Sequence, residues 1–271
     1  MQAPVVKDIV LIGGGHAHAL VIRMWAMNPV PGLRLTLISP QVHTPYSGML
    51  PGLVAGHYSF EQTHIDLVRV CAWAKVRFIQ ASASAIDATN KTITLSERPD
   101  IGYDVCSVDI GSTPNQNIEG CEEFAVPVKP ISRFYRHWQT LQQELLNHKK
   151  SSPLKVAIIG GGAGGIELIT AMEHWAKNNH CQAQFCLVSR GDQLLADSPK
   201  SVQKNVKRHL AHNNIELHLG FESQSITASH IHSKQQKIAY DKVFYCTQAS
   251  AADWLKQSPL DLTADGFIQV N

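Results

Sequence analysis

The fold is decided by residues 11–22, "LIGGGHAHALVI", in which an apolar run meets three glycines and then a segment of helical character. A strand that runs into a glycine turn and then a helix is the usual opening of a βαβ dinucleotide-binding unit. The G-x-G-x-x-G pattern is incomplete, because Gly13 and Gly15 are present but His18 takes the third position. The stretch therefore predicts a nucleotide-binding turn with one altered position.

A second copy of the pattern, "KVAIIGGGAGGIELI" at residues 155–169, has all three glycines. Each copy is followed by a helical stretch and another apolar strand, "LRLTLIS" at 33–39 and "AQFCLVS" at 183–189. In such a turn the first glycine permits the tight bend, the second lets the backbone approach a pyrophosphate, and the helix N-terminus offers N–H donors. Two copies predict an α/β chain with two nucleotide sites.

His18 leaves two interpretations open. The third glycine mainly allows the helix to pack closely on the strand, so a larger residue pushes the helix outward or turns its ring away. The ring is then either packed or solvent-facing, or it lies near the phosphates of a cofactor.

Composition excludes several other classes of function. With 24 Lys and Arg against 22 Asp and Glu, the 271 residues carry a formal net charge of +2, so we expect no nucleic-acid partner. Glycines and charged residues interrupt the longest apolar run, so we expect no transmembrane segment. The six cysteines lack metal-ligand spacing, and the N-terminus lacks a secretory signal. We therefore expect no metal site and a cytoplasmic location.

Two such units in tandem resemble the pyridine nucleotide-disulfide oxidoreductase superfamily, over essentially the whole chain. Within it, "GGGHAHA" followed by "ISPQVHTPYSGMLPG" is most similar to the NADH dehydrogenase-like, FAD-containing domain that many bacteria carry fused to selenide, water dikinase. The resemblance implies two Rossmann-like domains with mostly parallel sheets, the nicotinamide domain being inserted in the FAD domain. We expect an FAD-binding domain with a connecting helix at 1–150, an NAD(P)-binding domain at 151–247 and a return segment at 248–271.

The resemblance also implies an activity. It predicts an FAD-dependent NAD(P)H oxidoreductase, in which NADH or NADPH passes a hydride to flavin N5 and the electrons continue to an unidentified small-molecule acceptor. A selenide, water dikinase domain and a second copy of the chain are the expected protein partners. The alternative is a non-catalytic nucleotide-binding module that senses redox state or docks a partner.

Site residues follow from the matched motifs. Glu167 matches a glutamate that relatives place near the nicotinamide–flavin contact, although a first-turn acid also suits the helix dipole. Residues 40–51 match the segment that runs under the flavin. The expected cofactor-binding residues are Gly13, Gly14, Gly15, His16, His18, Ser39, Pro40, Thr44, Pro45, Tyr46, Gly111 and Pro114 for FAD, and Gly160, Gly162, Ala163, Gly165, Ser189 and Arg190 for NAD(P)H.

Several positions depart from the family pattern. Ser39 stands where an acid usually holds the adenosine ribose, and Ser189 with Arg190 replaces the acid of NADH-specific members. A guanidinium there suits the 2′-phosphate of NADPH, although it is equally compatible with a solvated surface arginine. In "YDVCSVDIGSTPN" at 103–115, Asp109 replaces the usual alanine beside FAD, and in the second such segment Gln248 replaces a glycine.

The cysteines and the end of the chain bear on activity. The first helix lacks the C-x-x-x-x-C disulfide, and Cys121 lacks the partner that sulfide oxidation would need. The chain ends at "DGFIQVN", before the family's A-G-D segment. The sequence thus predicts weak or absent FAD occupancy.

Overall fold

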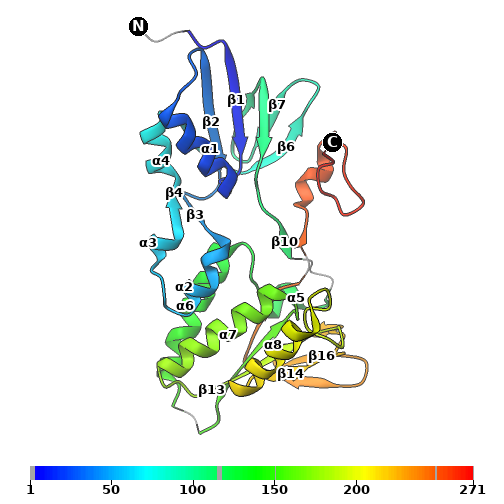
Figure 1. Cartoon of the computed structure of the whole chain (residues 1–271). Helices are drawn as coiled ribbons and strands as arrows, with labels where there is room; N and C mark the ends of the chain where they lie inside the picture. Colours follow the sequence, from blue (N-terminus) through cyan, green and yellow to red (C-terminus); the bar gives the residue numbers. More distant parts are fainter. Residues whose placement is uncertain (1–3, 115–117, 150, 248, 271) are drawn as a thin grey trace. The chain divides into compact units, whose positions relative to one another are not determined.

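The chain, seen in a computed structural model, divides into two compact units (Figure 1). The structure describes residues 4–114, 118–149, 151–247 and 249–270, so Gln248 lies outside the described residues. Unit 1 comprises Met1–Tyr46, Phe60–Thr113 and Ser250–Asn271, and unit 2 comprises Ser47–Ser59 and Pro114–Ala249.

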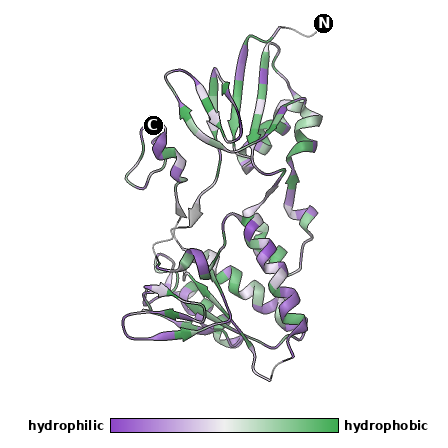
Figure 2. Cartoon of the chain, turned by 180° about the vertical axis from the view of Figure 1, so that it is seen from behind, coloured by the Kyte–Doolittle hydropathy of each residue, from purple (hydrophilic) through white to green (hydrophobic). Residues whose placement is uncertain are grey.

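Unit 1 is built on a four-stranded parallel sheet in the order β5-β2-β1-β9. The central strand is β1 (Lys7–Ile12), and its neighbours are β2 (Leu33–Ser39) and β9 (Val105–Val108), with β5 (Arg77–Gln80) at the edge. Near-continuous apolar runs in β1 and β2 match a sheet that is covered on both faces, and Figure 2 shows hydrophobic residues along these strands.

Helices cover one face of this sheet and a small antiparallel sheet covers the other. Leu11, Leu35 and Leu37 pack with α1 (His16–Met27) and α4 (Leu67–Ala74). On the opposite face lie β6 (Ala83–Asp87), β7 (Thr92–Leu95) and β8 (Arg98–Gly102). The remaining elements of this unit are β3 (His43–Pro45), β4 (His64–Asp66), α3 (Phe60–Thr63) and the 3-10 helix η2 (Asp253–Gln257).

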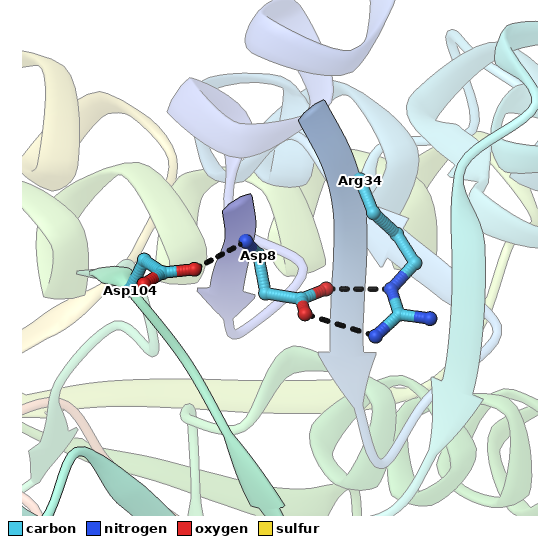
Figure 3. A network of polar contacts seen from close by, with 3 residues as sticks. All are labelled: Asp8, Arg34 and Asp104. Carbon is cyan, nitrogen blue, oxygen red and sulfur yellow. Dashed lines mark hydrogen bonds and ion pairs between the residues drawn. The ribbon is translucent and has the colours of Figure 1, made fainter. Parts of the chain in front are cut away.

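A polar network ties together the amino ends of β1, β2 and β9 (Figure 3). The Asp104 carboxylate accepts the Asp8 backbone N–H at 2.7 Å, and the Asp8 carboxylate receives two hydrogen bonds from the Arg34 guanidinium. This network lies at the opposite end of the sheet from the glycine turn that follows β1.

Unit 2 repeats the same plan with a five-stranded parallel sheet in the order β11-β18-β12-β13-β14. Its central strand is β12 (Leu154–Ile159), between β13 (Ala183–Val188) and β18 (Lys242–Tyr245), with β14 (Glu216–His218) and β11 (Val126–Pro127) at the edges. An antiparallel sheet again covers one face, formed by β15 (Ser225–Ile226), β16 (His230–His232) and β17 (Lys237–Ala239).

The other face of unit 2 is covered by helices. They are α2 (Leu50–Val54), α6 (Ile131–Asn147), α7 (Ala163–Asn178) and α8 (Lys200–His212), and the 3-10 helix η1 (Ser47–Met49) directly precedes α2. The short helix α5 (Cys121–Phe124) instead packs on the face of the antiparallel sheet. The helical stripe read in the sequence faces this core: all five of its residues, Ile131, Phe134, Trp138, Leu141 and Leu145, are buried.

The predicted fold class is confirmed, since both units are α/β with parallel main sheets. The division differs from the predicted domain boundary at 150. Helix α6 and residues 47–59 belong to unit 2, because Leu50, Leu53, Phe134 and Trp138 share one apolar core there. The chain therefore enters unit 2 first at Ser47 and returns to unit 1 after Ser59 and again after Ala249.

Candidate functional site

Each unit places its glycine turn at the same point of its sheet. Strand β1 lies between β2 and β9, and β12 lies between β13 and β18, so in both sheets the order reverses at the strand that precedes the turn. Ligands of open parallel sheets bind beyond the carboxyl ends of the strands at this reversal. Both turns therefore occupy the binding position of a doubly wound fold.

Matching backbone hydrogen bonds hold the two turns. The N–H of Gly13 donates to the Ile38 carbonyl and that of Gly160 to the Val188 carbonyl, each at 2.8 Å. Both glycines have positive φ, +94° and +136°, a region that side chains rarely allow.

The residue after the neighbouring strand completes this frame. The N–H of Asp109 donates to the Ile12 carbonyl and that of Cys246 to the Ile159 carbonyl, again at 2.8 Å. Asp109 and Cys246 are therefore equivalent positions in the two units. This equivalence allows the turns to be compared residue by residue.

The third fingerprint position is where the two units first differ. A Cβ at Gly165 would lie 1.9 Å from the Gly160 carbonyl oxygen, so glycine is required there. His18, at the same position in unit 1, is only 2% exposed, and its Nδ1 lies 2.7 Å from the Gly13 carbonyl oxygen. Because a carbonyl only accepts, we assign the hydrogen to Nδ1, and Nε2 pairs with the Ser107 hydroxyl at 2.9 Å. The ring is packed, and both nitrogens bind protein groups.

The N-terminus of α1 is the second difference. The Asp109 carboxylate accepts the backbone N–H groups of Ala17 and His18, at 3.1 and 3.4 Å. It occupies the space where a Cβ at Gly15 would be, within 2.1 Å of that position. The carboxylate thus caps α1 from the residue that follows β9, using the N–H groups that an N-cap side chain would bind.

The N-terminus of α7 is open by comparison. Among the described residues, no atom lies within 4 Å of a Cβ placed at Gly162, and Ala163 is exposed at the first helical position. The Cys246 sulfur lies 3.1 Å from a Cβ placed at Gly164. Burial raises the pKa of the Cys246 thiol, with Lys129 lowering it and Glu167 raising it further, so the nearby group is a neutral thiol.

The predicted catalytic residue, Glu167, is exposed in the first turn of α7 and lies close enough to influence Cys246 electrostatically. Sequence reasoning placed Glu167 but missed Cys246. The frame position of Cys246, directly after β18, could have been found by aligning the two halves of the chain.

The predicted residues of the flavin segment lie mainly in unit 1. Pro40 follows β2, Thr44 and Pro45 belong to β3, and the Tyr46 ring stacks on His16 with 4.4 Å between centroids. From Ser47 onward the segment belongs to unit 2.

The remaining predicted residues have varied surroundings. The Ser39 hydroxyl donates to the Gln41 carbonyl at 2.9 Å, so its hydrogen serves its own turn rather than projecting outward. Gly111 has a φ of +74°, and Pro114 ends the short strand β10 (Thr113–Pro114).

Ser189 and Arg190 follow β13 beside the second turn. The Ser189 side chain is buried, and its oxygen lies 2.3 Å from a Cβ placed at Gly161. Arg190 is exposed. Ser189 is therefore part of the packed interior of the turn, whereas the Arg190 side chain is accessible to a charged ligand.

A family model described as pyridine nucleotide-disulphide oxidoreductase matches residues 7–271. The chain belongs to this family. Members pair a pyridine nucleotide with FAD, which agrees with the cofactors expected from the sequence, FAD with NADH or NADPH. In line with the family, the shared frame of the two turns is that of two dinucleotide-binding units.

The chain is also similar to individual proteins. A demethylphylloquinone reductase of Synechocystis is 21% identical over 261 residues, which cover 88% of this chain and 63% of that protein. The NDH2 structure from Plasmodium falciparum in complex with NADH has a TM-score of 0.79 at 17% identity, covering 93% of this chain and 57% of that one. The structure of reduced Bacillus anthracis CoADR-RHD has a TM-score of 0.84 at 17% identity, covering 100% and 49%. The chain therefore spans between about half and two thirds of these proteins.

Two features are absent from the described part of the chain. No helix there is long and apolar enough to cross a membrane. Within the same residues, no group of three or more His, Cys, Asp or Glu side chains is arranged to hold a metal ion.

The two turns differ in how well they fit a dinucleotide. At the second turn the helix N-terminus is open at Gly162, and the residues present fit a pyrophosphate. At the first turn the backbone frame fits, but the Asp109 carboxylate holds two of the N–H groups that a pyrophosphate would need. In this position the Asp109 carboxylate and the pyrophosphate of FAD would compete for the same two N–H groups.

Proposed function

We propose that the chain is the dinucleotide-binding part of an FAD-dependent NAD(P)H oxidoreductase, with NAD(P)H at the turn after β12 and FAD at the turn after β1. The observation that carries the proposal is the repeated frame: two glycine turns with matching hydrogen bonds, each at the reversal point of a parallel sheet. Family membership and the oxidoreductase names of the similar proteins support it.

At the second turn, the roles of individual residues follow from their surroundings. Gly162 lets the backbone approach a pyrophosphate, and the first N–H groups of α7 would donate to it. We propose that Glu167 takes part in catalysis near the nicotinamide, where it either positions the ring or accepts and donates a proton. The other predicted glycines shape the turn.

We further propose NADPH as the preferred reduced nucleotide. A carboxylate after β13 would bind the ribose hydroxyls of NADH, but this chain has Ser189 and the exposed Arg190 instead. A guanidinium offers paired donors to a phosphate, so it favours the additional 2′-phosphate of NADPH.

The acceptor and partners rest on the resemblance to the dikinase-fused domain. By that analogy we propose a selenium or sulfur species as the acceptor, a selenide, water dikinase domain and a second copy of the chain as partners, and a cytoplasmic location. These are proposals from fold-level similarity rather than from the site.

The second candidate is a nucleotide-binding module without catalysis, and the position of Asp109 favours it. A chain that binds NAD(P)H on unit 2 but excludes FAD from unit 1 could report the ratio of reduced to oxidised nucleotide without transferring electrons.

The test measures binding and reduction in the same preparation. The purified chain is incubated with FAD, freed of excess flavin and mixed anaerobically with NADPH or NADH in a stopped-flow instrument. For the oxidoreductase, bound flavin bleaches within the turnover time, and faster with NADPH. If NADPH binds while flavin is absent or stays oxidised, the chain is the non-catalytic module.

A further inference from the structure

The two turns share one backbone frame but differ in what occupies the helix N-terminus. In unit 1 the carboxylate of Asp109 lies there, and in unit 2 the equivalent residue is Cys246, whose carbonyl has the same place beside the turn. The Gly13 and Gly160 Cβ positions both lie 2.2 Å from the carbonyl oxygen of that residue, which shows how closely the frames agree. At this position the two units therefore differ in the side chain.

Asp109 makes the contacts of a bound anion. Its backbone carbonyl accepts the Gly15 N–H at 3.2 Å, and its carboxylate accepts the N–H groups of Ala17 and His18. An oxygen with a negative charge at the positive end of a helix is the arrangement by which these turns bind a pyrophosphate. The carboxylate and the pyrophosphate cannot use these two N–H groups together, and their charges repel.

The neutral residue at the equivalent position leaves the second turn accessible. The thiol of Cys246 carries no charge at neutral pH, since burial raises its pKa. Among the described residues, no atom approaches within 4 Å of a Cβ at Gly162, whereas the Asp109 carboxylate fills the matching space at Gly15. The chain thus has one open turn and one that it occupies itself.

We propose that Asp109 is a built-in competitor for the dinucleotide at the first turn, so that FAD binds there only when this side chain leaves the N-terminus of α1. The inference rests on the proposed function, since it takes FAD as the ligand of unit 1. Asp109 is half-buried and follows the end of β9. In the proposed FAD-bound state its side chain adopts another rotamer, which releases the two N–H groups.

The experiment compares FAD binding by four full-length proteins: the wild type and the variants Asp109→Ala, Asp109→Asn and Asp104→Asn. Asp109→Asn removes the charge but keeps an oxygen that can cap α1, which guards against loss of folding. Asp104→Asn is the matched control, because Asp104 flanks the other end of β9 and its carboxylate accepts the Asp8 N–H. Dissociation constants for FAD come from flavin fluorescence and equilibrium dialysis.

If Asp109 competes, both Asp109 variants bind FAD about tenfold more tightly than the wild type, and Asp104→Asn does not. Equal FAD affinity in all four proteins would overturn the inference and leave the proposed function standing. A gain in Asp104→Asn as large as in the Asp109 variants would also overturn it, because net charge would then be the cause. Failure of every variant to bind FAD would overturn both the inference and the assignment of FAD to unit 1.

Discussion

Replacement of Gly165 by alanine tests the steric basis of the second turn. An added Cβ would lie 1.9 Å from the Gly160 carbonyl oxygen, whereas real Cβ contacts essentially never fall below 3.0 Å. The turn must therefore open by roughly 1 Å. Gly160 cannot move freely, because its N–H is bonded to Val188 and its α-carbon faces the Cys246 carbonyl.

We expect Gly165→Ala to destabilise unit 2 by about 3 kcal/mol, at the upper end of the cost of overpacking. For a unit of this size the loss corresponds to a decrease in unfolding temperature of roughly 6–12 °C. The matched control is Gly162→Ala, the same chemical change three residues earlier, where φ is −80° and no described atom lies within 4 Å of the new methyl group. Its cost is less than about 1 kcal/mol, that of alanine at an N-cap.

The two variants also separate folding from binding. The Gly162 methyl group would stand where a pyrophosphate approaches, so Gly162→Ala weakens NADPH binding by about tenfold although the fold is retained. Calorimetric melting and NADPH titration measure the two effects on the same samples. A Gly165→Ala protein within about 0.5 kcal/mol of the wild type, or a Gly162→Ala protein that is the less stable of the two, would refute this reasoning.

Three further predictions concern other parts of the chain. His18→Ala leaves two polar partners unsatisfied, and we expect it to lower the free energy of unfolding by about 2 kcal/mol in urea titrations. The control is His16→Ala, at an exposed ring whose contact is the stack on Tyr46, and it costs no more than about 1 kcal/mol. Equal losses would contradict the packing role of His18. Arg190→Ala weakens NADPH binding about tenfold without changing NADH binding in calorimetric titrations. The control is Arg136→Ala, at an exposed arginine of α6, which changes the binding of neither nucleotide. If Arg190→Ala weakened the binding of NADH and NADPH equally, a contact with the 2′-phosphate would be excluded. Burial raises the pKa of the Cys186 thiol to about 12 from 9.0, so as pH rises above about 9 the unfolded state loses this proton before the folded state does. The free energy of unfolding then falls with pH, by at most about 1.4 kcal/mol per pH unit. In urea unfolding at several alkaline pH values, the free energy of unfolding should fall less steeply with pH for Cys186→Ala, and an equally steep fall would contradict the raised pKa of Cys186.

Local patterns in the sequence predicted the elements that position the turns. Each strand, turn and helix of the two units lies within about 30 residues, where hydrophobic period and glycine spacing specify the geometry directly. The stripe of α6 was also readable, because one buried helix face repeats every three or four residues.

The domain boundary was not readable in the same way. Residues 47–59 lie between two segments of unit 1 in the sequence, yet Leu50, Leu53 and Val54 pack into the core of unit 2. Their apolar character indicates only that they are buried somewhere. Which core receives them depends on the partners offered by α6 and α7, which lie far along the chain.

The state of the first turn depends on similarly distant contacts. The sequence showed that Asp109 replaces the usual alanine. Its hydrogen-bond partners, Ala17 and His18, lie 92 and 91 positions earlier in the chain, and a single sequence carries no record of that pairing. For His18, the sequence offered a packed or outward ring and a ring near the phosphates. In the structure the ring is packed and is paired with Ser107 on β9, which lies 89 positions away in the sequence.

Both changes act on the same few atoms. The first N–H groups of any helix lack partners within the helix. In α1 the carboxylate of Asp109 satisfies two of these groups. The His18 ring, where the family pattern has a glycine, forms a hydrogen bond with the Gly13 carbonyl. Unit 1 therefore obtains from its own side chains the stabilisation that a bound phosphate would otherwise supply. A ligand stabilises a fold according to its affinity for the folded state. Because Asp109 must give up these N–H groups before FAD can use them, the affinity for FAD, and with it the free energy that FAD contributes to unit 1, is reduced. At α7, no charged side chain among the described residues occupies the corresponding position beside Gly162. A nucleotide that binds there displaces no such side chain and contributes its full binding energy.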